Sequence, residues 1–111
     1  MSEFLLVFRR DYQTATIQPS PEKMQEHLKD WADWLRSLAA EDKLAISVQQ
    51  YDNYGKVLHA QDVSEGPYTT SGHAINGLII LTANDYEEAV EMAMDSPVLE
   101  LGGTVEIRQV L

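Results

Sequence analysis

The sequence has 111 residues, a length typical of a single domain with one modest hydrophobic core. Hydrophobic residues make up 44% and charged residues 23% of the chain, a balance that excludes a largely disordered protein. The formal net charge of −10 disfavours binding to nucleic acid, because the phosphate backbone would be repelled.

The chain contains no cysteine, which excludes disulfide bonds and zinc sites built from thiolates. A reducing compartment fits this composition, so we expect a cytoplasmic protein. The apolar run at residues 4–8 is followed at once by Arg9 and Arg10, and it is far too short to span a membrane or to form the core of a signal peptide. We therefore expect no membrane anchor.

Residues 3–9 are predicted to form the first strand. Phe4, Leu6 and Phe8 share one face of this strand, and Leu5 and Val7 share the other. A strand with one exposed face would alternate polar and apolar residues, so this strand is expected to be covered on both sides.

A helix is predicted to begin after Ser20, whose hydroxyl can cap the first turn, with Pro21 at the first helical position. Apolar residues then recur at spacings of four and three, which predicts one buried face that ends near residues 40–42. These residues are Met24, Leu28, Trp31, Leu35 and Leu38.

Residues 44–50 alternate in polarity and predict a half-exposed strand with Leu44, Ile46 and Val48 turned inward. Residues 52–55 read as a turn, and residues 56–60 as the returning arm of a hairpin. A second strand with two apolar faces is predicted at residues 77–82.

The second helix is predicted to be capped by Asn84, and Glu87, three residues later, could complete a capping box with it. Its buried stripe is expected to consist of Tyr86, Ala89, Val90 and Ala93. Residues 96–97 (Ser-Pro) end or interrupt this helix, and residues 102–103 (Gly-Gly) turn the chain into a last strand at 104–110.

The order of elements predicts an α+β fold of the ferredoxin-like βαββαβ type, an antiparallel sheet with both helices on one face. The two strands with apolar residues on both faces then need a second cover. A second copy of the chain, packed sheet to sheet, would supply it and bury about 800 Å² or more per partner. We therefore expect a homodimer through the sheet face.

Several short motifs occur in order along the chain, and together they resemble the YCII-related (DGPF) family. They are residues 20–22 (SPE), 65–68 (EGPY), 76–80 (NGLII), 85–89 (DYEEA), 96–97 (SP) and 102–108 (GGTVEIR). The resemblance covers nearly the whole chain and implies one domain at residues 1–111, of the dimeric α/β-barrel type, in a bacterial cytoplasmic protein. Most such relatives have no assigned function, and some are associated with sigma factors.

The wider superfamily includes proteins with a proposed His–Asp pair, the histidine on the first helix and the aspartate just before the proline that closes the second. The resemblance places Trp31 and Ser96 at these positions. An indole does not titrate and a hydroxyl is not a carboxylate, so the pair is not intact. A shifted pair of His27 and Asp95 remains an alternative.

Six residues are candidates for a ligand site: His27, Trp31, Trp34, Tyr68, His73 and Arg9. The first three can share one side of the first helix and line a cleft for an aromatic or anionic ligand, or they can simply pack in the core. Tyr68 and His73 lie on a predicted loop. Arg9 could attract an anion or form a surface ion pair, and antiparallel pairing of the first and last strands need not bring it near Arg108.

No metal site and no cofactor are expected, because the three histidines are separated by 32 and 14 residues, unlike the close spacing of a helix-borne metal site. The sequence favours a small-molecule-binding or interaction module without an intact His–Asp pair. The alternatives are a cofactor-independent enzyme acting on a small substrate in the helix–sheet cleft, and a regulatory domain that docks a basic protein through its acidic second helix (Glu87, Glu88 and Glu91).

Overall fold

The computed structural model describes residues 1–11, 14, 18–48, 51 and 54–111. Two helices, a short 3-10 helix and seven strands make up this part of the chain. In chain order they are β1 (Ser2–Arg10), α1 (Pro21–Ala40), β2 (Leu44–Val48), β3 (Lys56–Leu58), β4 (Val63–Glu65), β5 (Thr69–Thr70), β6 (His73–Ala83), α2 (Tyr86–Ala93), η2 (Pro97–Leu101) and β7 (Thr104–Gln109).

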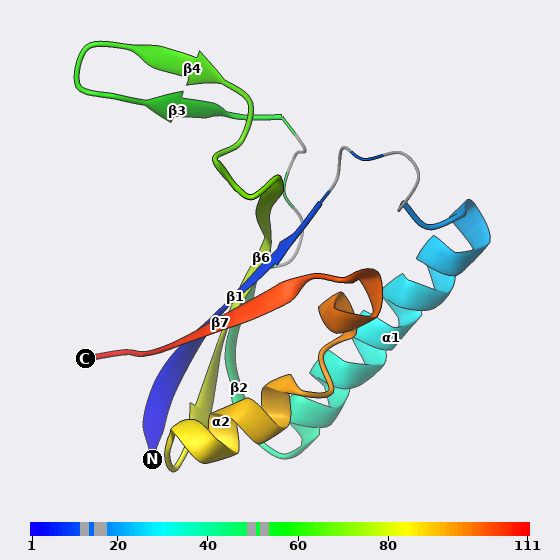
Figure 1. Ribbon diagram of the computed structural model, residues 1–111. Helices are drawn as coiled ribbons and strands as arrows, with labels where there is room; N and C mark the ends of the chain where they lie inside the picture. The colour runs from blue at the N-terminus through cyan, green and yellow to red at the C-terminus, as the bar shows by residue number, and fades with distance from the viewer. Residues whose placement is uncertain (12–13, 15–17, 49–50, 52–53) are drawn as a thin grey trace.

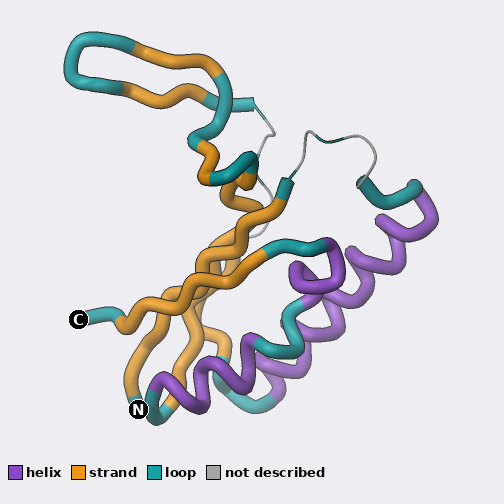
Figure 2. The backbone as a smooth tube through the Cα atoms, viewed as in Figure 1, coloured by secondary structure: helices purple, strands orange, loops and turns teal. Residues whose placement is uncertain are grey.

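The main sheet has the strand order β2-β6-β1-β7, and the short β5 extends it beside β6. Every pair in this path is antiparallel. Both helices pack on the same face of the sheet, and the opposite face carries no helix (Figures 1 and 2). The predicted α+β, ferredoxin-like fold is confirmed.

The core lies between the sheet and the helices. Its fully buried large side chains are Phe4, Phe8, Leu6, Ile79, Leu81 and Val98. The inward residues of β1 and β6 face each other in the ladder, since Phe4 lies opposite Leu81 and Leu6 opposite Ile79. The predicted alternation of β1 therefore holds on its helix-covered face.

Helix α1 begins where predicted. The Ser20 hydroxyl accepts a hydrogen bond from the backbone N–H of Lys23 at 3.3 Å, and Pro21 is the first helical residue. The buried face differs from the predicted stripe, because it contains His27, Trp34, Leu35 and Leu38, whereas Leu28 is exposed. Trp34, which the four-and-three spacing left out, is buried in the core against Phe8.

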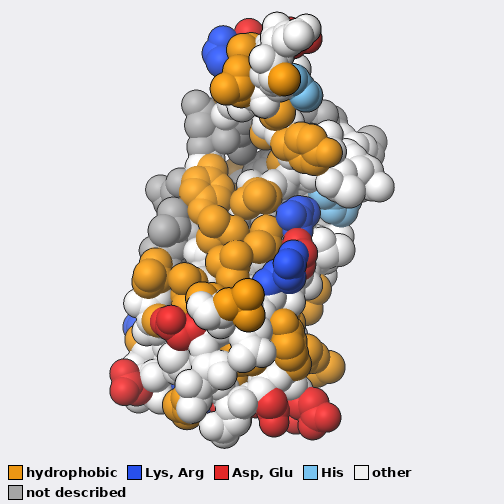
Figure 3. Space-filling view, turned by 90° about the vertical axis from the view of Figure 1, so that its left-hand side faces the viewer, with side chains coloured by type: hydrophobic (Ala, Val, Ile, Leu, Met, Phe, Trp, Pro, Cys, Tyr) orange, Lys and Arg blue, Asp and Glu red, His pale blue; other side chains and the backbone are white. Residues whose placement is uncertain are grey.

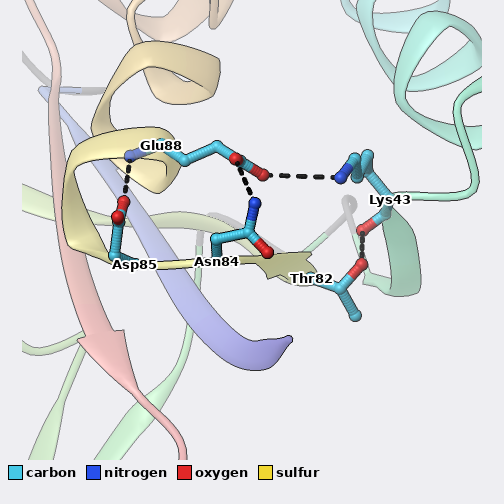
Figure 4. Close-up of polar contacts among 5 residues, drawn as sticks. All are labelled: Lys43, Thr82, Asn84, Asp85 and Glu88. Atoms are coloured by element: carbon cyan, nitrogen blue, oxygen red, sulfur yellow. Dashed lines mark hydrogen bonds and ion pairs between the residues drawn. The ribbon is translucent and has the colours of Figure 1, made fainter.

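The predicted cap of the second helix is wrong by one residue. Asp85, in an extended conformation, is the N-cap and accepts from the N–H of Glu88 at 2.9 Å (Figure 4). Asn84 instead donates to the Glu88 carboxylate at 2.9 Å, and Lys43 lies 3.4 Å from the other oxygen of the same group. These contacts tie the start of α2 to the segment before β2. Of the predicted stripe, Ala89 and Ala93 are buried, whereas Tyr86 and Val90 are exposed.

Strand β2 contains a register shift that the alternating pattern missed. Leu44 lies opposite Leu81, but Ile46 lies opposite Ile80, so Ile46 belongs to the face without helices and is 54% exposed. A bulge inserts an extra residue and reverses the side on which the following side chains lie. The predicted inward position of Ile46 is therefore wrong. Residues 49–50, the predicted end of this strand, lie outside the described residues.

Residues 56–58 do not return along β2 as predicted. They form β3, which pairs with β4 in a separate two-stranded sheet whose turn spans residues 59–62. This hairpin projects beyond one end of the main sheet (Figure 1). Residues 52–53 of the predicted turn at 52–55 lie outside the described residues. At the end of this turn, the carbonyl of Gly55 accepts a hydrogen bond from the N–H of Gly66 at 2.6 Å.

Strand β6 also carries a bulge, at Asn76. Phe8 of β1 lies opposite Gly77, whereas Arg9 lies opposite Ile75, so Asn76 is the extra residue between them. As a result Ala74 is buried, while Ile75 turns to the face without helices. The same face carries Leu5 and Val7 of β1 together with Leu78 and Ile80 of β6, and we call it the open face.

Candidate functional site

His27 is a buried histidine on the first half of α1, with only 5% of its surface exposed. The indole N–H of Trp31, one turn further along the helix, donates to His27 Nε2 at 2.8 Å. A ring nitrogen that accepts a hydrogen bond carries no proton, so the neutral ring must carry its proton on Nδ1. Trp31 thus fixes the tautomer of His27.

The Nδ1 atom of His27 is buried and has no hydrogen-bond partner among the described residues. Its nearest acidic neighbour is the carboxylate of Glu100 in η2, with Oε2 3.6 Å away, slightly too far for a full hydrogen bond. The Glu100 side chain is 56% exposed, so this carboxylate lies between the buried ring and the solvent. His27 and Glu100 form a histidine–carboxylate pair at the surface of the helix layer.

Arg10 completes this group of residues. It is the last residue of β1 and is only 8% exposed, which is rare for a charged side chain. Its guanidinium donates to the Gln18 side chain at 3.5 Å. Its positive charge acts on His27, so Arg10, His27, Trp31 and Glu100 form one electrostatically connected group, here called the His27 cluster.

The pKa of His27 is lowered below its ordinary value near 6.5, chiefly because burial penalises the charged imidazolium. The Glu100 carboxylate opposes this shift, and the Arg10 charge adds to it. The ring is therefore neutral at pH 7. This agrees with the hydrogen bond from Trp31, which a doubly protonated ring could not accept.

The aromatic residues beside His27 pack edge to face against β1. The ring of Phe8 lies 4.9 Å from that of Trp31 and 5.9 Å from that of Trp34, centroid to centroid. The Trp34 indole also donates to the carbonyl of Met92 at 3.3 Å. Trp34 is thus a core residue, and Trp31, half-buried, forms the boundary between the core and the His27 cluster.

The other three candidate residues lie elsewhere. Arg9 is on the open face, where its guanidinium contacts Glu106 at 2.8 Å. Tyr68 is exposed, and His73 is the half-buried first residue of β6. In the described part of the chain, neither makes a hydrogen bond, ion pair or ring contact with the His27 cluster. The structure therefore brings together His27, Trp31 and Trp34 but leaves the other three apart.

Arg9 and Arg108 both contact Glu106, although the strand pairing alone did not require it. The strands β1 and β7 are antiparallel, with Leu5 opposite Arg108 and Val7 opposite Glu106. Both guanidinium groups reach the Glu106 carboxylate, that of Arg108 at 3.4 Å. Their hydrogen bonds, first that of Arg9 and then that of Arg108, lower the pKa of Glu106 and keep it ionised.

Comparison with known proteins agrees with this architecture. The family model described as "YCII-related domain" matches residues 4–111. The chain belongs to this family. Among solved structures, the 5-chloro-2-hydroxyhydroquinone dehydrochlorinase of Burkholderia phenoliruptrix AC1100, in complex with 2,5-dihydroxybenzoquinone, is similar to the YCII-related chain with a TM-score of 0.53. The two share 15% sequence identity over 97% of this chain and 93% of that one, which shows a common fold. No curated protein matches the chain.

Trp31 and Ser96 of the YCII-related domain are both engaged in internal hydrogen bonds. Ser96 is buried, and its hydroxyl donates to the carbonyl of Ala93 at 2.6 Å. Asp95, the aspartate of the alternative shifted pair, is exposed. The carboxylate beside His27 belongs instead to Glu100, five residues after Asp95.

Sequence reasoning missed Arg10 and Glu100. Arg10 lies one residue beyond the predicted first strand, and it is buried because it continues the inward alternation of Phe4, Leu6 and Phe8. Glu100 reaches His27 only because η2 follows Pro97 and packs beside α1. A proline-initiated turn after the second helix was a usable signal that this segment returns to the helix layer.

Two further findings concern metal binding and membrane-spanning helices. Within the described ranges, no three histidine, aspartate or glutamate side chains are grouped so that they could hold a metal ion. No helix in the same part of the chain is long and apolar enough to cross a membrane.

The lowered pKa of His27 has a measurable effect on stability. Below about pH 6.5 the unfolded chain protonates its histidine while the folded protein still excludes the proton. The unfolded state therefore binds more protons, and the free energy of unfolding falls as the pH drops through this range toward the folded-state pKa. In urea unfolding between pH 7.5 and 5.0, His27→Gln should reduce this loss, because its amide oxygen can still accept from Trp31 but does not titrate.

His59→Gln is the matched control, since the His59 side chain is exposed and its ring contacts the Ser64 hydroxyl. This variant should follow the wild-type pH dependence. Parallel curves for the wild type and His27→Gln would contradict the assignment of a neutral, buried His27.

Proposed function

We propose that this YCII-related domain binds a small molecule that carries a hydroxyl group on an aromatic or apolar frame, and that the His27 cluster is its binding site. One observation carries the proposal: the buried Nδ1–H of His27 points toward the exposed Glu100 carboxylate without a full hydrogen bond. A buried donor left in this state costs about 1–3 kcal/mol, which a bound group can recover.

The two polar groups of the site select the ligand chemistry. A hydroxyl oxygen can accept the Nδ1–H of His27 while its own proton is donated to Glu100. A carboxylate ligand would be repelled by Glu100, because nothing on the ligand could donate to it. The half-buried Trp31 offers an aromatic surface on which the frame of the ligand can rest.

The tautomer of His27 favours binding over catalysis. A general base needs a free lone pair, but the lone pair of His27 on Nε2 already accepts from Trp31, and Nδ1 carries the proton. In the alternative function, a cofactor-independent enzyme, Glu100 would therefore have to be the base. The dehydrochlorinase of similar fold is named as a complex with a hydroxylated ring, but at 15% identity this likeness supports only a shared architecture.

Binding can be tested with hydroquinone as the hydroxylated probe and benzoate as the anionic one. Hydroquinone at millimolar concentration should shift the NMR signals of the Trp31 indole and the His27 ring, and benzoate should not. Glu100→Ala should weaken hydroquinone binding at least fivefold, because the acceptor of the ligand hydroxyl is lost. Glu91→Ala, which removes an exposed carboxylate from α2, should leave binding unchanged.

Shifts confined to other residues, or equal binding by the wild type and Glu100→Ala, would contradict the proposed site. Tighter binding of benzoate than of hydroquinone would contradict the proposed ligand chemistry.

We also propose that a second copy of the chain covers the open face. Apolar side chains gather over the middle of this face (Figure 3). They are Leu5, Val7, Ile46, Ile75, Leu78 and Ile80. A patch of this kind in water is typical of an interaction surface, and the absence of net charge among Glu3, Arg9, Glu106 and Arg108 on the same face lets two acidic copies approach.

The cytoplasmic location and the bacterial origin stay proposals, supported by the lack of cysteine and by the family resemblance. Docking of a basic protein by α2 is the less favoured alternative, because Glu88 is engaged with Lys43 and Asn84. Glu87 and Glu91 remain exposed.

A further inference from the structure

The β3–β4 hairpin presents apolar side chains to solvent in an unusual way. Leu58 and Val63 lie directly opposite each other in the ladder and are 79% and 50% exposed. On the same side of the hairpin, Lys56 and Glu65 form a 3.1 Å ion pair. A two-stranded hairpin is marginally stable by itself in water, so an exposed aliphatic pair on it favours a covering surface.

The hairpin lies on the side of the molecule that the open face occupies. In Figure 1 the helices are on the right of the sheet, and the hairpin leans toward the left, beyond the open side. Figure 3 looks at the molecule from that side and shows hydrophobic side chains both over the sheet and on the projecting hairpin. A molecule packed on the open face would therefore lie within reach of the hairpin.

The area of the open face is a reason for the hairpin to take part. At about 3.3 Å per residue and about 4.8 Å between strands, the four long strands outline roughly 500 Å². A stable dimer buries about 800 Å² of accessible surface per partner, and the hairpin would add to the surface that the sheet supplies. The exposed Leu58 and Val63 are further apolar surface on the projecting hairpin.

The charges of the hairpin also suit a second copy. Lys56, Asp62 and Glu65 sum to −1, and the four charged residues of the open face sum to zero. Six of the 18 acidic residues lie instead between residues 85 and 100, in the helix layer and η2. Two chains of net charge −10 can thus meet through the hairpin and the open face with little repulsion.

We propose that the β3–β4 hairpin is a dimerisation arm, in which Leu58 and Val63 pack against the second copy of the chain that covers the open face. In a dimer with twofold symmetry each copy contributes one arm to the other. The inference rests on the proposed homodimer and adds to it the element that completes the interface.

The direct test is an isotope-filtered NOE experiment on a sample that mixes ¹³C-labelled and unlabelled protein. Intermolecular contacts from the methyl groups of Leu58 and Val63 are expected. The matching variant is Leu58→Ser with Val63→Ser, which should raise the dimer dissociation constant at least tenfold in sedimentation equilibrium. Because both side chains are exposed, its thermal unfolding as a monomer should resemble that of the wild type.

The control is Met94→Ser with Leu99→Ser, two exposed apolar residues of the helix layer, and it should leave the dissociation constant unchanged. Suppose that the wild type is a dimer, that the hairpin variant does not weaken it, and that intermolecular NOEs come only from the open face. The proposed role of the hairpin as a dimerisation arm is then wrong, while the proposed homodimer stands. A wild type that is monomeric at all concentrations overturns both.

Discussion

Replacing Ile80 by glutamate is expected to convert the proposed dimer to a monomer. Ile80 lies at the centre of the open face, with Leu5 opposite it on one side and Ile46 on the other. Twofold symmetry places two copies of the substitution in one interface. Each loses the burial of an isoleucine, worth about 1.5–3 kcal/mol, and each new carboxylate adds a desolvation penalty of several kcal/mol. The dimer dissociation constant should therefore rise by more than about 100-fold.

Light scattering would report this change as a fall in mass to that of the 12.5 kDa chain. Ile80→Thr keeps the β-branched shape and should give a smaller effect of the same sign, which guards against a glutamate variant that fails to fold. Val90→Glu, at an exposed valine of α2, adds the same charge to the helix layer and should remain dimeric. Equal behaviour of Ile80→Glu and Val90→Glu would exclude the open face as the interface.

Replacing Gly103 by alanine should destabilise the fold by about 3 kcal/mol or more, at the upper end of the range for overpacking. A Cβ at this buried position would lie 2.5 Å from the Arg9 carbonyl oxygen, 2.5 Å from Val98 Cγ2 and 2.9 Å from the Val98 carbonyl oxygen. Two of these three neighbours are backbone atoms, which cannot move without disturbing β1 and η2. The glycine lets η2 pass directly against the end of β1.

The adjacent Gly102 supplies the control. Its φ is +73°, but a Cβ there would meet nothing within 4 Å, so Gly102→Ala should cost only about 1–2 kcal/mol for the left-handed backbone. Urea unfolding of the two variants measures the difference. Equal losses would mean that close packing at Gly103 is unimportant and that both glycines serve only the turn.

The fold could be predicted largely because hydrophobic periodicity is local information. Consecutive residues are enough to predict the apolar faces of β1 and β6 and the capped start of α1 at Ser20. The order of strands and helices is then compatible with only a few topologies. The failures arose where one residue shifts a pattern. Ile46 followed a bulge that alternation does not reveal, and Asp85 rather than Asn84 took the cap because the extended backbone occurs one residue later.

The sequence predicted only those residues of the candidate site that lie on helix α1. His27, Trp31 and Trp34 share one side of α1 because residues three and four apart are neighbours, and the hydrogen bond from Trp31 to His27 follows from this spacing. Glu100 and Arg10 come from other elements, so their approach depends on how η2 and β1 pack. For the same reason Arg9 and Arg108 could share Glu106 although the strand directions alone did not bring them together.

The bulge at Asn76 has a consequence for how this chain can change length. The segments of β6 on either side of Asn76 are out of phase, so that Ala74 and Ile79 both point to the helices although they are five positions apart. Loss of Asn76 itself would leave a regular ladder, in which Ile75 stays on the open face and Ala74 stays inward opposite Arg10. An insertion at residues 59–62 would only lengthen a turn. Length variation among related chains should therefore be tolerated at the hairpin tip and, as the loss of a single residue, at the bulge in β6.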